Sequence, residues 1–188
     1  VIRSPEDAAR YKIGMIHQHF KLVGVHTAAD NILLGSKKES WLLRKNRGAR
    51  IRELCDAYGL EIDPDKRVYD MSVSEKQTVE ILKVLYRGAD ILILDEPTAV
   101  LTPQETDRLF AILRRMREDG CAVIIITHKL GEVLAISDRV TILRKGQSVA
   151  TVKTADTDAR QLTELMVGRP ITLSIERPEP ERHEKLLE

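Results

Sequence analysis

The chain has 188 residues, and 43% of them are hydrophobic, which is enough for one well-buried domain. Lysine and arginine total 30 against 29 for aspartate and glutamate, so the net charge is +1. This balance, with only 4% aromatic residues, argues against nucleic-acid binding through basic charge and stacking rings. Cys55 and Cys121 lack a C-x-x-C partner, and no apolar run is long enough to span a bilayer. We therefore expect free thiols in a reducing compartment and no membrane span.

The first 88 residues predict one short strand and a mainly helical segment. Apolar residues recur at helical spacing over much of this stretch, and glycines mark the helix ends. The expected elements are a strand over 12–17, a loop to 25, a helix over 28–34 capped by Thr27 and ended by Gly35, a helical stretch over 41–60, a loop over 62–70, and a helix over about 74–87 ended by Gly88.

The remainder of the chain predicts strands that alternate with helices. Glycine, proline and charged residues separate these segments and mark their ends. The expected elements are a strand over 91–94, a helix from Pro103 to Gly120 with Leu109, Ile112, Leu113 and Met116 facing the core, a fully buried strand over 121–127, a helix over 130–136, a hairpin of strands 139–143 and 148–152 around Lys145-Gly146, a helix over 158–167, and a Pro- and Glu-rich linker from Pro170.

The two strands over 91–94 and 121–127 carry continuous rather than alternating apolar residues. Continuous runs indicate burial on both faces, which occurs in parallel sheets with helices on either side. The sequence therefore predicts an α/β fold around a parallel sheet. Residues 29–60 contain no such strand, and we expect them to form a helical insertion.

Residues 71–97 carry the strongest chemical signal. The run I-L-I-L-D-E-P predicts a buried strand that ends in the carboxylates Asp95 and Glu96. The helix just upstream has a serine-rich start, and the free N–H groups of a helix start suit an anion. Together they indicate phosphate chemistry, although no G-x-x-x-x-G-K-[ST] loop occurs in the chain. The alternative is that Asp95 and Glu96 only cap the loop before Pro97.

Short motifs follow one another along the chain. They are M-I-H-Q-H-F around Gln18, M-S-V-S-E-K-Q over 71–77, I-L-I-L-D-E over 91–96 and I-T-H-K around His128. Over about 13–169 they resemble the Q-loop, the signature, the Walker B motif with its catalytic glutamate, and the switch histidine of the ABC transporter nucleotide-binding domain. The resemblance implies a P-loop NTPase fold, with an ABC ATPase domain over 1–169, a helical subdomain over about 28–88, and a linker or tail over 170–188.

Longer passages are similar to one branch of this family. They are H-Q-H-F-K-L-V and Y-R-G-A-D-I-L-I-L-D-E-P-T-A-V-L-T-P-Q-E, which resemble the first cassette of tandem ATPases of simple-sugar and nucleoside importers. The resemblance implies an ATPase that uses ATP and Mg²⁺ at the cytoplasmic face of the cell membrane. Its implied partners are a second ABC cassette, transmembrane permease subunits that dock on the Q-loop and the helical insertion, and indirectly a substrate-binding protein, but no nucleic acid.

The resemblance also implies roles for residues at the motif positions. The expected catalytic residues are Glu96, which would polarise the attacking water, with His128 and Gln18. The expected Mg²⁺ ligands are Asp95 and Gln18. The signature residues expected to meet the nucleotide of a second cassette in trans are Ser72, Val73, Ser74 and Glu75.

The signature and the D-loop depart from the family pattern. Val73 and Ser74 occupy the two glycine positions, and the Cβ of Ser74 would hold the backbone away from a phosphate. Thr102 stands where an aspartate is common in the D-loop. Ser74-x-x-Gln77 is also a capping-box pattern, so we expect the helix to be capped there.

The missing phosphate-binding loop leaves alternative functions open. We expect the Walker A loop and its strand upstream of Val1, so that the chain is an N-terminally truncated cassette with an exposed sheet edge. Such a chain alone would bind ATP poorly and hydrolyse it at a background rate. The alternatives are a non-catalytic fragment or interaction module, and a soluble ABC protein that acts on the ribosome or DNA.

A basic cluster lies in the expected helical insertion, close to Trp41. A solvated helix face explains such a cluster better than nucleic-acid or lipid binding. We expect Trp41 to anchor the insertion's own small core rather than to pack on a permease helix. The cluster consists of Lys37, Lys38, Arg44, Lys45, Arg47 and Arg50.

Overall fold

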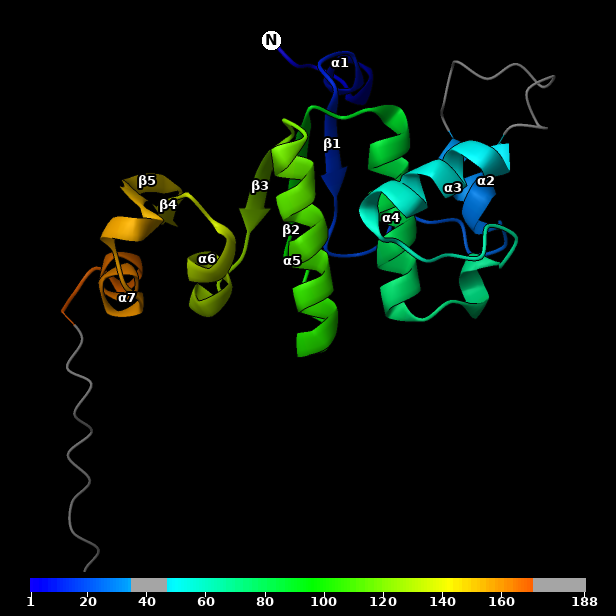
Figure 1. The fold of residues 1–188 in the computed structure, drawn as a ribbon. Helices are drawn as coiled ribbons and strands as arrows, with labels where there is room; N and C mark the ends of the chain where they lie inside the picture. The colour runs from blue at the N-terminus through cyan, green and yellow to red at the C-terminus, as the bar shows by residue number, and fades with distance from the viewer. Residues whose placement is uncertain (35–46, 171–188) are drawn as a thin grey trace, which may run out of the picture. The chain divides into compact units, whose positions relative to one another are not determined.

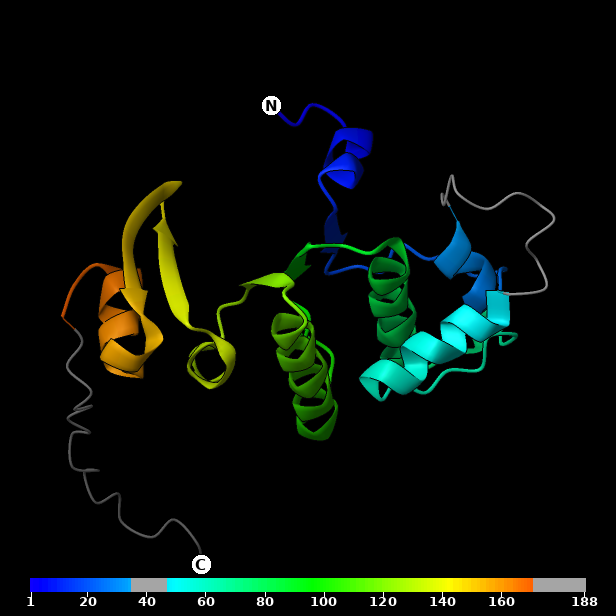
Figure 2. The same cartoon turned by 45° about the horizontal axis from the view of Figure 1, so that its top comes forward.

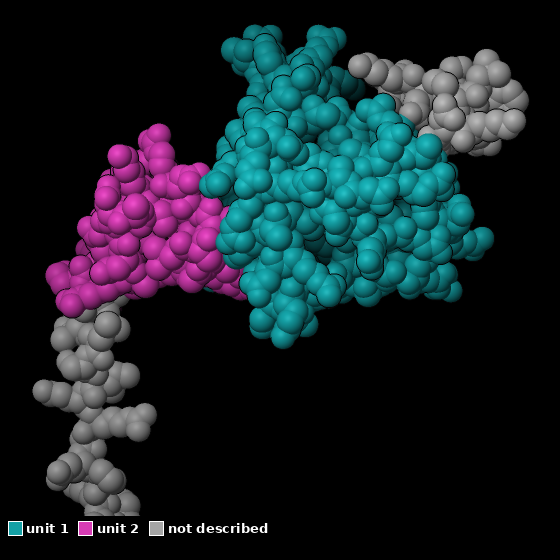
Figure 3. Space-filling model, viewed as in Figure 1, with its two compact units in different colours: residues 1–128 teal, residues 129–188 magenta. Residues whose placement is uncertain are grey.

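The computed structural model describes residues 1–34 and 47–170. They belong to two compact units, 1–128 and 129–188 (Figure 3). No helix among the described residues is both long and apolar enough to cross a membrane. The predictions that lie outside the described residues concern Gly35, the start of the 41–60 helix, Trp41, the linker after Pro170, and the basic residues Lys37, Lys38, Arg44 and Lys45.

A parallel sheet forms the centre of the first unit (Figure 1). Its strands β1 (Ile13–Ile16), β2 (Ile91–Asp95) and β3 (Ala122–Ile126) are hydrogen-bonded in the order β1-β2-β3. The register pairs Gly14 with Leu92, and Leu92 with Val123. Because the strands are parallel, their carboxyl ends lie at the same edge of the sheet, and residues that follow the strands meet there. The predicted parallel α/β fold is confirmed.

The helices of the first unit begin and end close to the predicted signals. Thr27 caps α2 by accepting a hydrogen bond from the Asp30 N–H, and α4 ends at Gly88, whose φ of 68° is left-handed. Arg50 lies over the ring of Tyr86 at 4.7 Å, so this member of the basic cluster makes an internal cation–π contact. The elements are α1 (Pro5–Arg10), α2 (Ala28–Leu33), α3 (Arg47–Tyr58), the 3₁₀ turn η2 (Val68–Asp70), α4 (Val73–Arg87) and α5 (Pro103–Glu118).

Helices α4 and α5 lie on the same side of the sheet (Figures 1 and 2). Helix α4 approaches β1 so closely that a methyl group on Gly14 would lie 2.7 Å from Val84 Cγ1. A larger residue at position 14 would therefore push the helix away from the strand. Helix α5 buries its apolar stripe as predicted, except that Phe110 is buried and Ile112 only half-buried.

The prediction that residues 121–127 form a fully buried strand is wrong. Side chains alternate between the two faces of a strand, so Val123 and Ile125 lie on the face of Leu92 and Leu94, which are fully buried. Ile124 and Ile126 lie on the opposite face and are about half exposed, at 51% and 50%. A continuous apolar run cannot distinguish these two cases, because it records hydrophobicity and not what covers each face.

The second unit is a hairpin with flanking helices, as predicted. Strands β4 (Arg139–Arg144) and β5 (Gln147–Lys153) pair antiparallel through a turn in which Lys145 and Gly146 both have positive φ, 49° and 77°. Two left-handed residues in succession match the twist of paired strands, which is why Gly follows Lys here. Helices α6 (Leu130–Ile136) and α7 (Ala159–Val167) and the turn η3 (Thr154–Asp156) complete the unit.

Candidate functional site

Three of the predicted site residues meet at the carboxyl edge of the sheet. Gln18, Glu96 and His128 each follow one strand of the sheet within two residues. Gln18 Nε2 donates a hydrogen bond of 3.2 Å to Glu96 Oε2. His128 Nδ1 lies 2.9 Å from Glu96 Oε1, and the ring nitrogen donates to this oxygen in the tautomer that carries its proton on Nδ1. Glu96 thus connects residues that are far apart in the sequence.

The backbone of Glu96 has an unusual conformation. Its φ is 45°, in the left-handed region that residues other than glycine seldom adopt. The Glu96 N–H still donates to the Ile126 carbonyl at 2.9 Å, so the parallel ladder continues into this residue. Such strain costs on the order of 1 kcal/mol and is often found at functional sites. The sequence carried no signal for it, because glutamate is not a residue that favours positive φ.

Asp95 is the last residue of β2 and is half-buried. It pairs with Ile126 in the register and lies on the sheet face opposite to Leu94. The Asp95 carboxylate and the amide oxygen of Gln18 are hard oxygen donors, which Mg²⁺ takes together with phosphate oxygens and water. This donor set fits the ion. Among the described residues, no three His, Cys, Asp or Glu side chains gather into a metal cluster of their own.

The signature residues form the start of α4, but its cap differs from the prediction. Ser72 Oγ accepts from the Glu75 N–H at 3.2 Å, and Glu75 Oε2 accepts from the Ser72 N–H at 2.7 Å. The predicted capping box of Ser74 and Gln77 is therefore wrong. Ser72 has the extended backbone that a cap requires, with a ψ of 168°, whereas Ser74 already lies inside the helix.

Lys66 forms an ion pair with the cap residue Glu75, and Gln77 follows Glu75 in α4 by two residues. Lys66 Nζ lies 2.6 Å from Glu75 Oε1, and this hydrogen bond, followed by the Ser72 N–H, lowers the pKa of Glu75. Gln77 is 5% exposed, and its Nε2 has no hydrogen-bond partner among the described residues. An unpartnered buried donor costs about 1–3 kcal/mol.

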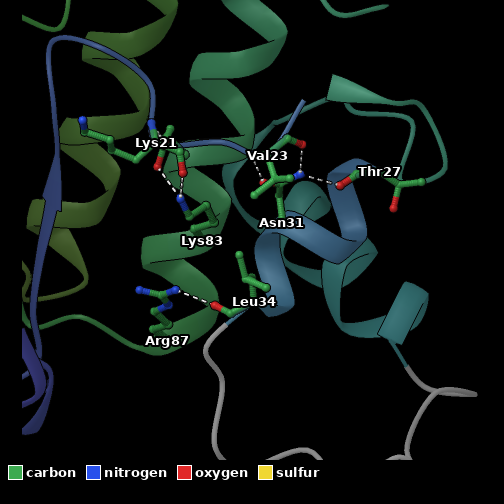
Figure 4. Close-up of polar contacts among 8 residues, drawn as sticks. Lys21, Val23, Thr27, Asn31, Leu34, Lys83 and Arg87 are labelled. Atoms are coloured by element: carbon green, nitrogen blue, oxygen red, sulfur yellow. Dashed lines mark hydrogen bonds and ion pairs between the residues drawn. The ribbon is translucent and has the colours of Figure 1, made fainter. Parts of the chain in front are cut away.

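The loop after Gln18 is anchored by buried polar side chains that no motif in the sequence predicts. Asn31, 1% exposed, accepts from the Val23 N–H at 2.7 Å and donates to the Val23 carbonyl at 3.1 Å (Figure 4). Glu80, 4% exposed, accepts from the Lys21 N–H at 2.7 Å. A possible signal was the charge of Glu80 between the apolar residues Val79 and Ile81. That pattern alone does not identify its partner.

An open groove of about 410 Å³ borders this loop. It lies beside both Gln18 and Val73, so it connects the strand-tip residues with the start of α4. Tyr69 and Val100 contribute exposed apolar surface, at 69% and 64%. The residues lining the groove are Gln18, His19, Phe20, Leu22, Gly24, Val68, Tyr69, Val73, Lys76 and Val100.

Comparison with known sequences gives a consistent set of relatives. A model of the ABC transporter family matches residues 2–99. A nucleoside import ATP-binding protein of Lactococcus lactis is 47% identical, over 100% of this chain and 37% of its own length. A guanosine import ATP-binding protein of Bacillus subtilis is 48% identical, over 94% and 35%. A ribose import ATP-binding protein of Streptomyces coelicolor is 43% identical, over 99% and 36%. The chain thus spans about a third of the length of these curated relatives.

Comparison with solved structures gives the same fold. An ATP-binding cassette solved as a dimer in a post-hydrolysis state with ADP and Pi has a TM-score of 0.68 and 23% identity, over 81% of this chain and 68% of its own. A component of an ABC transporter complex from Clostridium perfringens has a TM-score of 0.70 and 24% identity, over 88% and 67%. At this identity, the likeness establishes the fold.

Proposed function

Because the chain belongs to the ABC transporter family, we propose that it is the ATP-binding and ATP-hydrolysing part of an importer for a sugar or nucleoside. The names of the relatives, which import nucleosides, guanosine and ribose, support this substrate class. We assign the ATPase domain to residues 1–169, the helical subdomain to about 28–88, and the linker to 170–188. The protein would act at the cytoplasmic face of the cell membrane.

The observation that carries this proposal is the position of Glu96 between Gln18 and His128. The two oxygens of its carboxylate each accept one hydrogen bond, so the group is held in one orientation at the sheet edge. A carboxylate held in this way can orient a water and accept its proton. His128 is 69% exposed in its side chain, so it can turn its N–H toward a phosphate that arrives from solvent.

In this proposal, Asp95 and Gln18 hold Mg²⁺, which neutralises charge on the phosphates when it is bound. Gln18 would direct its amide oxygen to the ion while its Nε2 keeps the contact with Glu96. Asp95, as the last residue of a strand paired on both sides, offers a carboxylate on a rigid support.

The proposed partners follow from the start of α4 and from the groove. Ser72, Val73, Ser74 and Glu75 would face the nucleotide of a second cassette. The Ser74 Cβ and the Glu75 carboxylate would limit how closely a phosphate approaches. The groove beside Gln18, with its apolar lining, would receive a helix of a transmembrane permease subunit. A substrate-binding protein would act through that permease, and no nucleic acid is involved.

The test is Glu96→Gln in the complete ATPase that carries this chain, assembled with its permease. The amide keeps the shape of the side chain but cannot take a proton, so we expect turnover to fall at least about 100-fold while ATP binding is kept. Glu118→Gln, an identical change at an exposed position in the last turn of α5, is the matched control and should leave turnover unchanged. Turnover of Glu96→Gln close to that of the wild type would refute the proposal.

A further inference from the structure

Helix α4 carries charged side chains on the face that meets the loop after Gln18. Glu80, Lys83 and Arg87 are spaced so that they lie on one face of the helix. Arg87 Nη2 donates to the Leu34 carbonyl at 2.7 Å, at the end of α2, and Figure 4 shows it separated along α4 from Lys83. Arg87 thus binds the end of α2, whereas Glu80 and Lys83 bind the loop after Gln18.

Glu80 and Lys83 bind a single residue of the loop from both sides. Glu80 Oε1 accepts from the Lys21 N–H at 2.7 Å, and Lys83 Nζ donates to the Lys21 carbonyl at 3.1 Å. The pair closes on itself, because Lys83 Nζ also lies 2.9 Å from Glu80 Oε2. Both side chains are largely buried: the exposed fraction of the side chain alone is 5% for Glu80 and 13% for Lys83.

Stability does not account for this pair. Buried ion pairs lose hydration, and replacing one by apolar residues of similar size is often neutral or stabilising. Lys21 itself is exposed, so its peptide groups can bind water when the pair is removed. What the pair provides is a fixed position for Lys21, and Gln18 lies only three residues earlier in the same loop.

We infer that Glu80 and Lys83 are positioning residues for Gln18: they fix the loop so that the Gln18 amide meets Glu96. The inference rests on the proposed ATPase function.

The test is the double variant Glu80→Met/Lys83→Met in the complete ATPase that carries this chain. We expect it to melt within about 4 °C of the wild type. The Lys21 amide should exchange its hydrogen about tenfold faster or more, since its partner is gone. The turnover number should fall about tenfold, with the KM for ATP changed less than about twofold, because the defect lies in geometry and not in affinity.

Two further variants separate positioning from general effects. Arg87→Met removes a charge from the same helix face but does not touch Lys21, and it should leave both exchange and turnover unchanged. Lys83→Arg keeps the charge and the donors and should retain most of the turnover.

The inference is overturned if the double variant unfolds, if Lys21 exchange is unchanged, if exchange rises while turnover stays normal, or if Arg87→Met shows the same loss. A wild-type protein that does not hydrolyse ATP would refute the proposed function instead. The exchange rates alone would then decide whether the pair holds the loop.

Discussion

Gln18 and Val23 lie in the same loop, but the structure holds them in opposite ways. The side chain of Gln18 makes one hydrogen bond of 3.2 Å, to a carboxylate at the exposed sheet edge. The backbone of Val23 is bound at both its N–H and its carbonyl by Asn31, which is 1% exposed. The loop is thus held firmly at Val23, away from the sheet edge, and by a single side-chain contact at the edge, where Gln18 meets Glu96. Under the proposed function, Gln18 would exchange partners when a nucleotide arrives, and a fixed backbone would then matter more than a strong side-chain contact.

The largest effect on the free energy of unfolding is expected at Asn31, the buried residue that binds Val23. Asn31→Ala removes three hydrogen bonds, including one to the Thr27 carbonyl, and leaves the Val23 N–H without its partner, while the Val23 carbonyl still accepts from the His26 N–H. We expect the free energy of unfolding to fall by about 3 kcal/mol, measured by chemical denaturation. Gln104→Ala, which also truncates an amide but at an exposed position of α5, should change it by less than about 0.5 kcal/mol. A similar small change for Asn31→Ala would show that the loop is not anchored there.

A smaller effect of opposite sign is expected from Gln77. Like Asn31 it is a buried amide, but its Nε2 has no partner among the described residues. Gln77→Met keeps the length of the side chain and removes the unpartnered donor, so we expect a gain of about 1 kcal/mol in the free energy of unfolding. Gln104→Met is the control at an exposed site. A loss of stability for Gln77→Met alone would mean that this amide makes an interaction that water or a partner supplies.

The smallest effect on stability is expected at His128, on the exposed edge of the sheet. His128→Ala removes the contact with Glu96, but the histidine side chain is 69% exposed, so the free energy of unfolding should change by less than about 0.5 kcal/mol. Turnover of the complete ATPase should nevertheless fall by about 10- to 100-fold. A loss of more than about 1 kcal/mol in stability would contradict the comparison, because His128 would then be part of the anchored structure.

The sequence predicted most of the elements because their signals are local. Thr27 caps α2 and Gly88 ends α4 at the predicted residues, and Lys145-Gly146 forms the turn of the β4–β5 hairpin. These local predictions needed only the residue types. The shared role of Gln18, Glu96 and His128 was implied by the family resemblance, and the parallel sheet explains why they meet, since parallel strands place their carboxyl ends together.

The predictions from the sequence were wrong where one residue pattern fits two different structures. Ser72-x-x-Glu75 and Ser74-x-x-Gln77 both match a capping box, and only the extended backbone at Ser72 decides between them. The exposure of Ile124 likewise depends on which elements cover the sheet face, and not on its own hydrophobicity. The anchors Asn31 and Glu80 were not predicted, because both bind backbone groups of the loop after Gln18. Glu80 binds Lys21, which lies 59 residues away in the sequence, and Asn31 binds Val23 in a loop that has no periodic pattern.

The left-handed backbone of Glu96 has a consequence for how this position tolerates change over evolution. Its φ of 45° suits glycine or asparagine better than glutamate, so selection for stability alone would replace it. Under the proposed function, the glutamate persists there because its carboxylate is needed. Its replacement by glycine or asparagine in a descendant chain would then accompany the loss of hydrolysis, and it would relieve the strain of the left-handed backbone.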